Sequence, residues 1–197
     1  MNICVATKNA GKLDELQAIW ADAGYVLRTD PCYDDVVEGD ESYEANARLK
    51  AQALYRQLYR CNRPAAVLAD DSGLEVDALA GRPGVLSARF GGSSITWQQR
   101  RAFLLAKLDG VPLPQRHARF VCTMLLIDLD GTRHVGRGEV SGHIVMREEG
   151  SGGFGYDPIF CADGTTATFA QLSAAQKNAI SHRRRATQAV IAAMQAR

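Results

Sequence analysis

The sequence of 197 residues lacks a marked excess of charge of either sign. Lys and Arg number 23 and Asp and Glu number 22, so the formal net charge is only +1. A protein whose main partner is a long nucleic acid usually carries a clear basic excess. The composition therefore argues against a nucleic-acid partner and favours local recognition of a small phosphorylated ligand.

The sequence also lacks any C-x-x-C pair. Its five cysteines are odd in number and widely spaced, at Cys4, Cys32, Cys61, Cys122 and Cys161. Neither a disulfide framework nor a zinc site is expected from this pattern. Cys4 and Cys122 lie in apolar runs, so we expect small buried residues in a reducing compartment.

Long apolar runs are missing as well. No stretch approaches the roughly 18 apolar residues of a membrane span, and the opening MNICVATKNAGK lacks the apolar core of a signal peptide. We expect a cytoplasmic protein with no membrane partner. The absence of H-E-x-x-H and G-x-S-x-G patterns leaves a histidine metal site and a serine triad without support.

Hydrophobic periodicity predicts one α/β domain over residues 1–197, with a mixed sheet flanked by helices and two lobes. The apolar runs 2–6 and 65–69 are typical of buried strands, and 25–29 could form another. The periodic stretches 13–23 and 42–59 are typical of amphipathic helices. A ligand cleft between the lobes would be the usual arrangement.

The second half of the sequence indicates a β-meander followed by a helix. Residues 120–129, Asp130-Gly131 and TRHVGRGEV predict a hairpin with a tight turn, and SGHIVM continues the antiparallel sheet. Capping-box spacing predicts helix starts at Thr96 and Ser173. Residues 30–41 and 81–94 are predicted loops.

The segment TKNAGK (7–12) lies between the first predicted strand and the first helix. A helix N-terminus offers backbone N–H groups and the positive end of the helix dipole, and both suit phosphate. Lys12 adds a full charge, and Gly11 allows close approach. The alternative is an ordinary turn with Asn9 as the helix cap. The spacing of a P-loop is absent.

Asp70 and Asp71 directly follow the buried run AAVLA. Open α/β sheets place ligands at strand ends, and neighbouring strand residues point to opposite faces. We therefore expect one aspartate to enter the cleft and the other to brace the loop. Ser72 and Gly73 are expected to turn the chain, and a purely structural aspartate–serine turn is the alternative.

Glu38, Glu41 and Glu44 lie at or before the start of the long helix, where the helix dipole favours acidic side chains. Mg²⁺ prefers oxygen ligands and commonly takes only one or two protein carboxylates. Glu38 with Asp71 would satisfy that requirement, although spacing alone favours the dipole explanation.

Two further segments carry candidate ligand contacts. GSGGFGYDP (150–158) contains G-x-G-x-x-G, but no helix follows, as a dinucleotide fingerprint requires. Phe154 could stack on a base and Asp157 could accept from base N–H groups; the alternative is a tight connection with a core phenylalanine.

In KNAISHRRR (177–185), a continuous helix would place Lys177 and Ser181 on one face. The alternative there is a basic, solvated helix end.

Five motifs, in order, resemble the inosine/xanthosine triphosphate pyrophosphatase family, the Ham1-like proteins. They are T-x-N-x-x-K, D-D-S-G, S-A-R, G-G-F-G-Y-D-P and K-x-x-x-S-H-R, and they span nearly the whole chain. The resemblance implies an elongated, two-lobed α/β fold around a central mixed sheet, usually as a homodimer. It also implies Mg²⁺-dependent hydrolysis of ITP, dITP and XTP to the monophosphate and pyrophosphate.

The same resemblance implies roles for individual residues. Asp71 matches the catalytic aspartate, a proton acceptor and metal ligand, and Glu38 aligns with a metal-binding glutamate. The implied substrate contacts are Thr7, Lys8, Asn9, Ala10, Gly11, Lys12, Ser72, Arg89, Phe154, Gly155, Tyr156, Asp157, Lys177, His182 and Arg183.

The sequence departs from the family pattern at two positions. Ala45 stands immediately before the helix asparagine, where many relatives carry glutamate, and Phe90 follows Arg89, where tyrosine is common. The first change removes an acidic contribution to the metal shell unless Glu41 or Glu44 replaces it. The second change removes one hydroxyl.

The implied reaction is in-line attack of water on the α-phosphorus, with pyrophosphate leaving. Base selection would rest on hydrogen-bond donors, backbone N–H groups or His182 and Arg183, that face the carbonyl at purine position six. Three alternatives remain open. They are a Maf-type pyrophosphatase for other modified nucleotides, a nucleotide-binding regulator without catalysis, and a nucleic-acid-binding protein that uses Arg183–Arg185.

Overall fold

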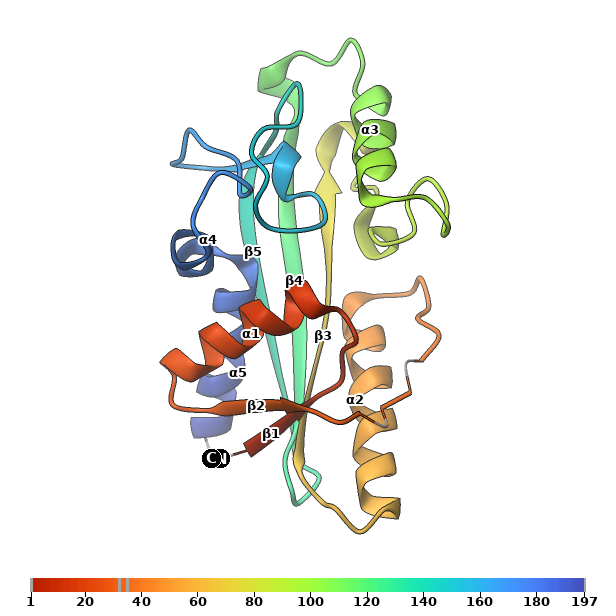
Figure 1. The fold of residues 1–197 in the computed structure, drawn as a ribbon, viewed down its shortest axis with the longest axis vertical. Helices are drawn as coiled ribbons and strands as arrows, with labels where there is room; N and C mark the ends of the chain where they lie inside the picture. Colours follow the sequence, from red (N-terminus) through yellow and green to blue (C-terminus); the bar gives the residue numbers. More distant parts are fainter. Residues whose placement is uncertain (1, 32, 35, 197) are drawn as a thin grey trace. The chain divides into compact units, whose positions relative to one another are not determined.

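The computed structural model describes residues 2–31, 33–34 and 36–196. Cys32, one of the cysteines considered above, and Asp35, in the predicted loop 30–41, lie outside the described residues. Figure 1 labels most of the helices and strands along the chain. The chain divides into two compact units. The first unit comprises Met1–Asp71, Cys122–Gly138 and His182–Arg197, and the second comprises Ser72–Val121 and Glu139–Ser181.

Over the described residues, the strands form one six-stranded mixed sheet in the order β2-β1-β3-β4-β5-β6. β1 pairs in parallel with β2 and β3, and β5 pairs antiparallel with β6. The strand bounds are β1 Asn2–Val5, β2 Val26–Thr29, β3 Ala66–Val76, β4 His117–Ile127, β5 Arg133–Ile144 and β6 Phe160–Ala162. Within the described part of the chain, no helix is long and apolar enough to cross a membrane.

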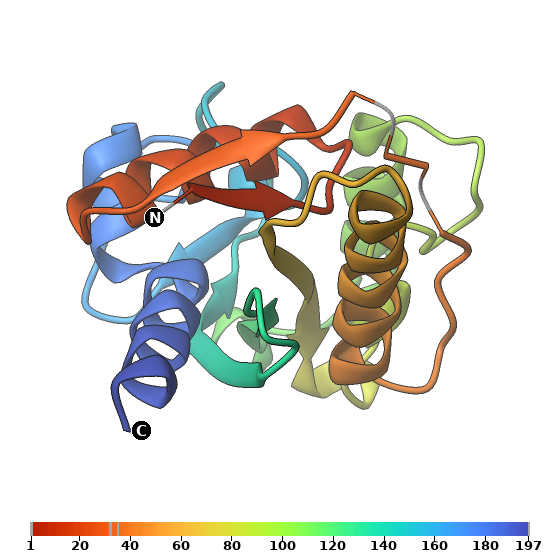
Figure 2. The same cartoon turned by 90° about the horizontal axis from the view of Figure 1, so that it is seen from below.

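The first unit has three layers, with the sheet between helices on its two faces. Alternate residues of β3 point to opposite faces and pack against different helices. Ala66 and Leu68 pack into a cluster with α1 (Ala10–Asp22) and α5 (His182–Gln195). Val67 and Ala69 pack into a second cluster with α2 (Tyr43–Arg60). Figure 2 shows α5 and α2 on opposite sides of β3. Both predicted helices and both predicted strands at 2–6 and 25–29 are confirmed in this unit.

The second unit is built around one apolar core. Leu74 and Val76 of β3, Leu104 and Leu108 near the end of α3, and Phe160 of β6 belong to it. α3 spans Trp97–Lys107 and α4 spans Ala174–Ile180. Both begin with a complete capping box, as predicted from the Thr96–Gln99 and Ser173–Gln176 spacings.

The structure corrects two expectations from the sequence. β3 does not turn at Ser72-Gly73 but continues as a strand to Val76, and its two aspartates are buried next to cationic side chains. The segment from Lys177 is not one continuous helix, because Ser181 is extended (φ −70, ψ 154) between α4 and α5. The predicted continuation of the sheet through SGHI is confirmed, because these residues form the end of β5, and the short β6 follows.

Two glycines of β5 allow α5 to pack directly against the strand. A Cβ added at Gly138 would overlap the backbone of His182 and Ala186, and one at Gly136 would lie 2.5 Å from the Ala186 carbonyl oxygen. Gly136 and Gly138 are two residues apart in β5, so they lie on the same face of the strand. The glycines therefore allow the first turns of α5 to lie directly against β5.

Gly138→Ala should lower the free energy of unfolding by about 2–3 kcal/mol, because backbone cannot yield as a flexible side chain can. Urea unfolding measures the change. Gly39→Ala is the matched control, because its Cβ would meet nothing closer than 3.8 Å. Equal unfolding midpoints for the two variants would show that the close packing of α5 is not required for stability.

Candidate active site

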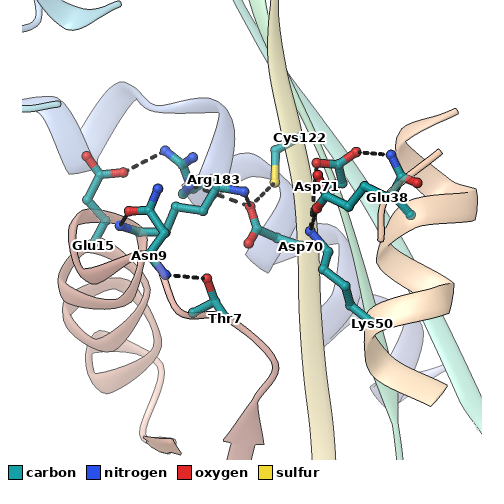
Figure 3. Close-up of polar contacts among 11 residues, drawn as sticks. Thr7, Asn9, Glu15, Glu38, Lys50, Asp70, Asp71, Cys122 and Arg183 are labelled. Carbon is teal, nitrogen blue, oxygen red and sulfur yellow. Dashed lines mark hydrogen bonds and ion pairs between the residues drawn. The ribbon is translucent and has the colours of Figure 1, made fainter. Parts of the chain in front are cut away.

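The adjacent carboxylates Asp70 and Asp71 lie in β3 and point to opposite faces of the sheet (Figure 3). Both are buried, at 1% and 4% exposed. The alternation that separates Leu68 from Ala69 also separates the two aspartates, so Asp70 faces α1 and α5 whereas Asp71 faces α2. The predicted placement of the two aspartates on opposite faces of the sheet is confirmed.

Asp70 is surrounded by cations. Its Oδ2 lies 3.1 Å from Lys12 Nζ and 3.8 Å from Arg183 Nε, and Cys122 Sγ lies 3.9 Å away. Burial alone raises the pKa of this carboxyl, but the charges of Lys12, Arg183 and Lys50 outweigh burial and hold the pKa below its usual range. Asp70 is therefore an ionised counter-ion for basic side chains on its face of the sheet.

Asp71 has a different environment. Asn46 Nδ2 donates to its Oδ2 at 2.9 Å, and Lys50 Nζ lies 3.8 Å from its Oδ1. Burial raises the pKa of Asp71, and the charges of Lys50 and Lys12 offset this only in part, so the net shift is upward. The ionised form of Asp71 is thus less well compensated than that of Asp70. A carboxylate in this condition is suited to receiving a further cation or a proton.

Lys50 connects Asp71 to Glu38. Its Nζ lies 2.6 Å from Glu38 Oε1, so one ammonium group serves both carboxylates. Burial lowers the pKa of Lys50, but Asp70, Asp71 and Glu38 raise it by more. Sequence reasoning missed Lys50. The available signal was its position within the apolar stripe of α2, four residues before the buried Leu54.

Asn46 was also missed, and it fixes the loop that carries Glu38. Its Oδ1 accepts from the Gly39 N–H at 2.9 Å, and its Nδ2 donates to the Gly39 carbonyl at 3.2 Å. Ala45 occupies the N3 position of α2, where its N–H donates to the capping Ser42 Oγ. A glutamate at that position would be placed to complete a capping box.

The segment 7–12 forms the N-terminus of α1 as predicted. Asn9 is the helix cap, and its Oδ1 accepts from the Lys12 N–H at 3.0 Å. Thr7 Oγ1 accepts from the Asn9 N–H at 3.2 Å. Lys8, Asn9 and Ala10 are exposed, whereas Gly11 and Lys12 are half-buried. The capping interpretation is confirmed, and the helix end remains available to an anion.

His182 and Arg183 open α5, and both are buried. Arg183 Nη1 donates to Glu15 Oε2 at 2.8 Å, while its Nε faces Asp70 (Figure 3). The guanidinium therefore bridges carboxylates of α1 and β3. Arg184 pairs with Asp22, and Arg185 is exposed, as expected for the outer side of a basic helix end.

The second unit holds a separate group around the glycine-rich loop. Asp157 Oδ2 accepts from the Phe154 N–H at 2.7 Å and from Lys177 Nζ at 2.5 Å. Lys177 Nζ also lies 4.7 Å from the centre of the Phe154 ring, close enough for a cation–π contact. A Cβ at Gly153, where φ is +66, would overlap Asp157, so this turn requires glycine. Asp157 thus organises the loop that presents Phe154.

The other candidates of the second unit surround this loop. Tyr156 is buried, and its hydroxyl donates to the Ser87 carbonyl at 2.9 Å. Ser87 Oγ in turn accepts from the Leu74 N–H and donates to the Gly84 carbonyl. Ser87 of the S-A-R motif is therefore a structural link that the sequence did not reveal. Arg89 is exposed, and Ser72 is half-buried within β3.

Phe90, the second departure from the family pattern, packs edge-on against Phe103 of α3 with ring centroids 5.3 Å apart. Its ring lies against the core of the second unit, where phenylalanine makes favourable aromatic contacts without a hydroxyl.

The carboxylates do not form a complete metal cage from protein ligands. Among the described residues, no group of three or more His, Cys, Asp or Glu side chains is placed to hold a metal ion. Glu38 and Asp71 supply two carboxylates around one cation, Lys50. This set matches an ion that takes its remaining ligands from phosphate and water, as Mg²⁺ commonly does.

Comparison with known proteins identifies related sequences over nearly the full chain. The model of the Ham1 family matches residues 3–193. A dITP/XTP pyrophosphatase from Exiguobacterium sibiricum is 42% identical over 197 residues, which cover 98% of this chain and 97% of the relative. A dITP/XTP pyrophosphatase from Nocardia farcinica is 44% identical over 204 residues, with 98% and 95% covered.

Solved structures agree with the sequence relatives. The Staphylococcus aureus Ham1 protein is 38% identical with a TM-score of 0.82, and the alignment covers 100% of this chain and 99% of that one. A HAM1 protein from Coxiella burnetii is 31% identical with a TM-score of 0.85, and both chains are covered completely. The predicted mixed α/β fold is confirmed.

Proposed function

The chain belongs to the Ham1 family, and from this premise we propose the reaction that it catalyses. It hydrolyses aberrant purine nucleoside triphosphates, ITP, dITP and XTP, to the monophosphate and pyrophosphate. The observation that carries this conclusion is the near-complete match to dITP/XTP pyrophosphatases, joined to a buried Asp71 with raised pKa beside Glu38. The Maf-type alternative is set aside by the family match.

The basic side chains of the first unit are suited to the triphosphate. Lys12 projects from the first turn of α1, beside the helix end formed by residues 7–11. Backbone N–H groups and the helix dipole there add to its charge. We assign the phosphates to this segment together with Arg183, whose guanidinium is held by Glu15 and Asp70. Asp70 thereby positions two phosphate-binding cations and takes no part in bond cleavage.

Glu38 and Asp71 are the proposed Mg²⁺ ligands. The fit rests on their donor chemistry, because both carboxylates already face one cation and Asp71 is incompletely compensated in its ionised form. When bound, Mg²⁺ would neutralise charge that develops on the phosphate oxygens. Asp71 orients the attacking water and accepts its proton, while Asn46 and Lys50 hold that carboxylate in place.

The glycine-rich loop is the proposed base-binding segment. Phe154 supplies a ring for stacking, and Lys177 and Asp157 hold the loop from within the second unit. Ser72, Arg89, Gly155, Tyr156 and His182 are retained as proposed substrate contacts. A cytoplasmic homodimer is proposed from the family resemblance, and sedimentation equilibrium would test the oligomeric state.

Pyrophosphate release from ITP, XTP, GTP and ATP with Mg²⁺ tests the proposed function. We expect rapid release from ITP and XTP and a kcat/KM lower by about 100-fold or more for ATP, whose six-amino group leaves donors unpaired. Equal rates with ATP would contradict the proposed selectivity. Tight ITP binding without release under any divalent cation would favour a regulator instead.

A further inference from the structure

Arg101 of α3 contacts the backbone of the glycine-rich loop. Its Nη1 donates to the Gly155 carbonyl at 2.9 Å, and its Nη2 donates to Glu148 Oε2 at 2.9 Å. The Arg101 side chain is only 14% exposed. An arginine whose planar fork is held at both ends by separate acceptors has little freedom to turn. Arg101 therefore fixes the orientation of the Gly155–Tyr156 peptide.

The orientation of that peptide determines what the loop can offer a ligand. In a planar trans peptide the C=O and N–H groups point in opposite directions. Because the Gly155 carbonyl is directed at Arg101, the Tyr156 N–H is directed away from it. A rotation of this peptide would present a carbonyl acceptor where the N–H donor now lies. Gly155, at φ +63, lacks the Cβ that would oppose such a rotation.

Trp97 supports the same peptide from the first turn of α3. Its ring meets the Tyr156 ring edge-on, with centroids 5.4 Å apart and planes at 82°. A Cβ built on Gly155 would lie 3.8 Å from Trp97 Cη2. The indole is itself covered by Arg100, whose Cζ lies 5.2 Å from the ring centre. Arg100 is anchored by the carbonyls of Phe90, Gly92 and Ile95.

We propose that Arg101, supported by Trp97, is a positioning residue for base selection. It holds the Tyr156 N–H as a donor for the six-carbonyl of the purine and prevents the peptide from presenting an acceptor to a six-amino group. This inference rests on the proposed function, since it assigns the base to this loop. Arg101 itself does not contact the substrate.

The test compares Arg101→Ala, Arg101→Lys and Lys107→Ala in the full chain. Lys107 is an exposed cation at the other end of α3 and serves as the matched control. For Arg101→Ala, the ratio of kcat/KM for ITP to that for ATP should fall about tenfold, mainly through a higher KM for ITP. Arg101→Lys should retain part of the ratio, because one ammonium can still donate to the Gly155 carbonyl. Lys107→Ala should keep the wild-type ratio.

A purely structural role would lower both kcat/KM values together and leave the ratio unchanged, which would overturn the proposal. Binding of ITP and ATP without metal provides a second readout that does not need turnover. Trp97 of α3 lies beside the loop and is 37% exposed, whereas Trp20 is fully buried. In a Trp20→Phe background, the fluorescence of Trp97 therefore reports binding at the loop. In Arg101→Ala, the ratio of the dissociation constant for ITP to that for ATP should rise, because binding of ITP is weakened more than binding of ATP. If the wild type shows no turnover but Arg101→Ala still shifts the binding ratio, the proposed function is contradicted and the positioning role of Arg101 is not.

Discussion

Asp71→Asn should lower kcat for pyrophosphate release from ITP by about 1000-fold or more, while ITP still binds. The amide has nearly the same shape and can keep a hydrogen bond with Asn46, but it can neither accept a proton from water nor carry charge to a metal. Steady-state kinetics and equilibrium binding of ITP, measured on the same preparation, separate the two effects.

The stability of this variant is part of the same expectation. Burial raises the pKa of Asp71, so its ionised form destabilises the fold at neutral pH relative to a neutral side chain. Asp71→Asn should therefore unfold within about 1 kcal/mol of the wild type. Asp40→Asn changes an exposed aspartate near Glu38 and should leave turnover intact. Wild-type turnover by Asp71→Asn would remove Asp71 from the reaction.

Unlike Asp71→Asn, Asp70→Asn should lower the free energy of unfolding by about 3–5 kcal/mol. The change leaves the Lys12 ammonium and the Arg183 guanidinium without the buried carboxylate that both face. Arg183 keeps its contact with Glu15, so the loss falls mainly on the contacts of Asp70 with Lys12 of α1 and Arg183 of α5. Urea unfolding at neutral pH measures the change.

Glu75→Gln is the matched control for this prediction. Glu75 pairs with Arg119, which is 46% exposed in its side chain, so losing that pair should cost about 1 kcal/mol or less. A stable Asp70→Asn together with an unfolded Asp71→Asn would reverse the roles assigned to the two aspartates.

Parts of both units could be predicted because their signals are local. Alternation along residues 66–71 places Asp70 and Asp71 on opposite faces, and capping spacings locate two helix starts. The turn at Ser72-Gly73 was wrong because polar residues at a strand end usually leave the sheet. Here the aspartates stay in the strand, where Lys12 of α1 compensates the burial of Asp70 and Lys50 of α2 offsets part of the burial of Asp71. Those partners are distant in sequence and no local pattern reveals them.

The site shows the same division between local and distant information. Asn9 as a cap follows from spacing, whereas the contact of Lys50 with both Glu38 and Asp71 depends on how α2 packs on the sheet. The break at Ser181 was missed because the sequence around it keeps a helical composition. Substrate roles came from the family resemblance, and no local geometry alone would have assigned ITP or XTP.

The structure also changes the interpretation of Ala45. The sequence places it where a metal-shell glutamate was expected, while the structure places it at the N3 position after the capping Ser42. The departure therefore falls at a helix cap and leaves Glu38, Asp71 and Lys50 together. This arrangement supports an active enzyme over a regulator that has lost catalysis.

Hydrolysis of ITP in heavy-oxygen-labelled water tests the central claim most directly. Attack on the α-phosphorus places the label in the inosine monophosphate and leaves the released pyrophosphate unlabelled, as mass spectrometry of the products would show. We predict that result, with one monophosphate formed for each pyrophosphate. Label in pyrophosphate, or formation of the diphosphate and inorganic phosphate, would contradict the account.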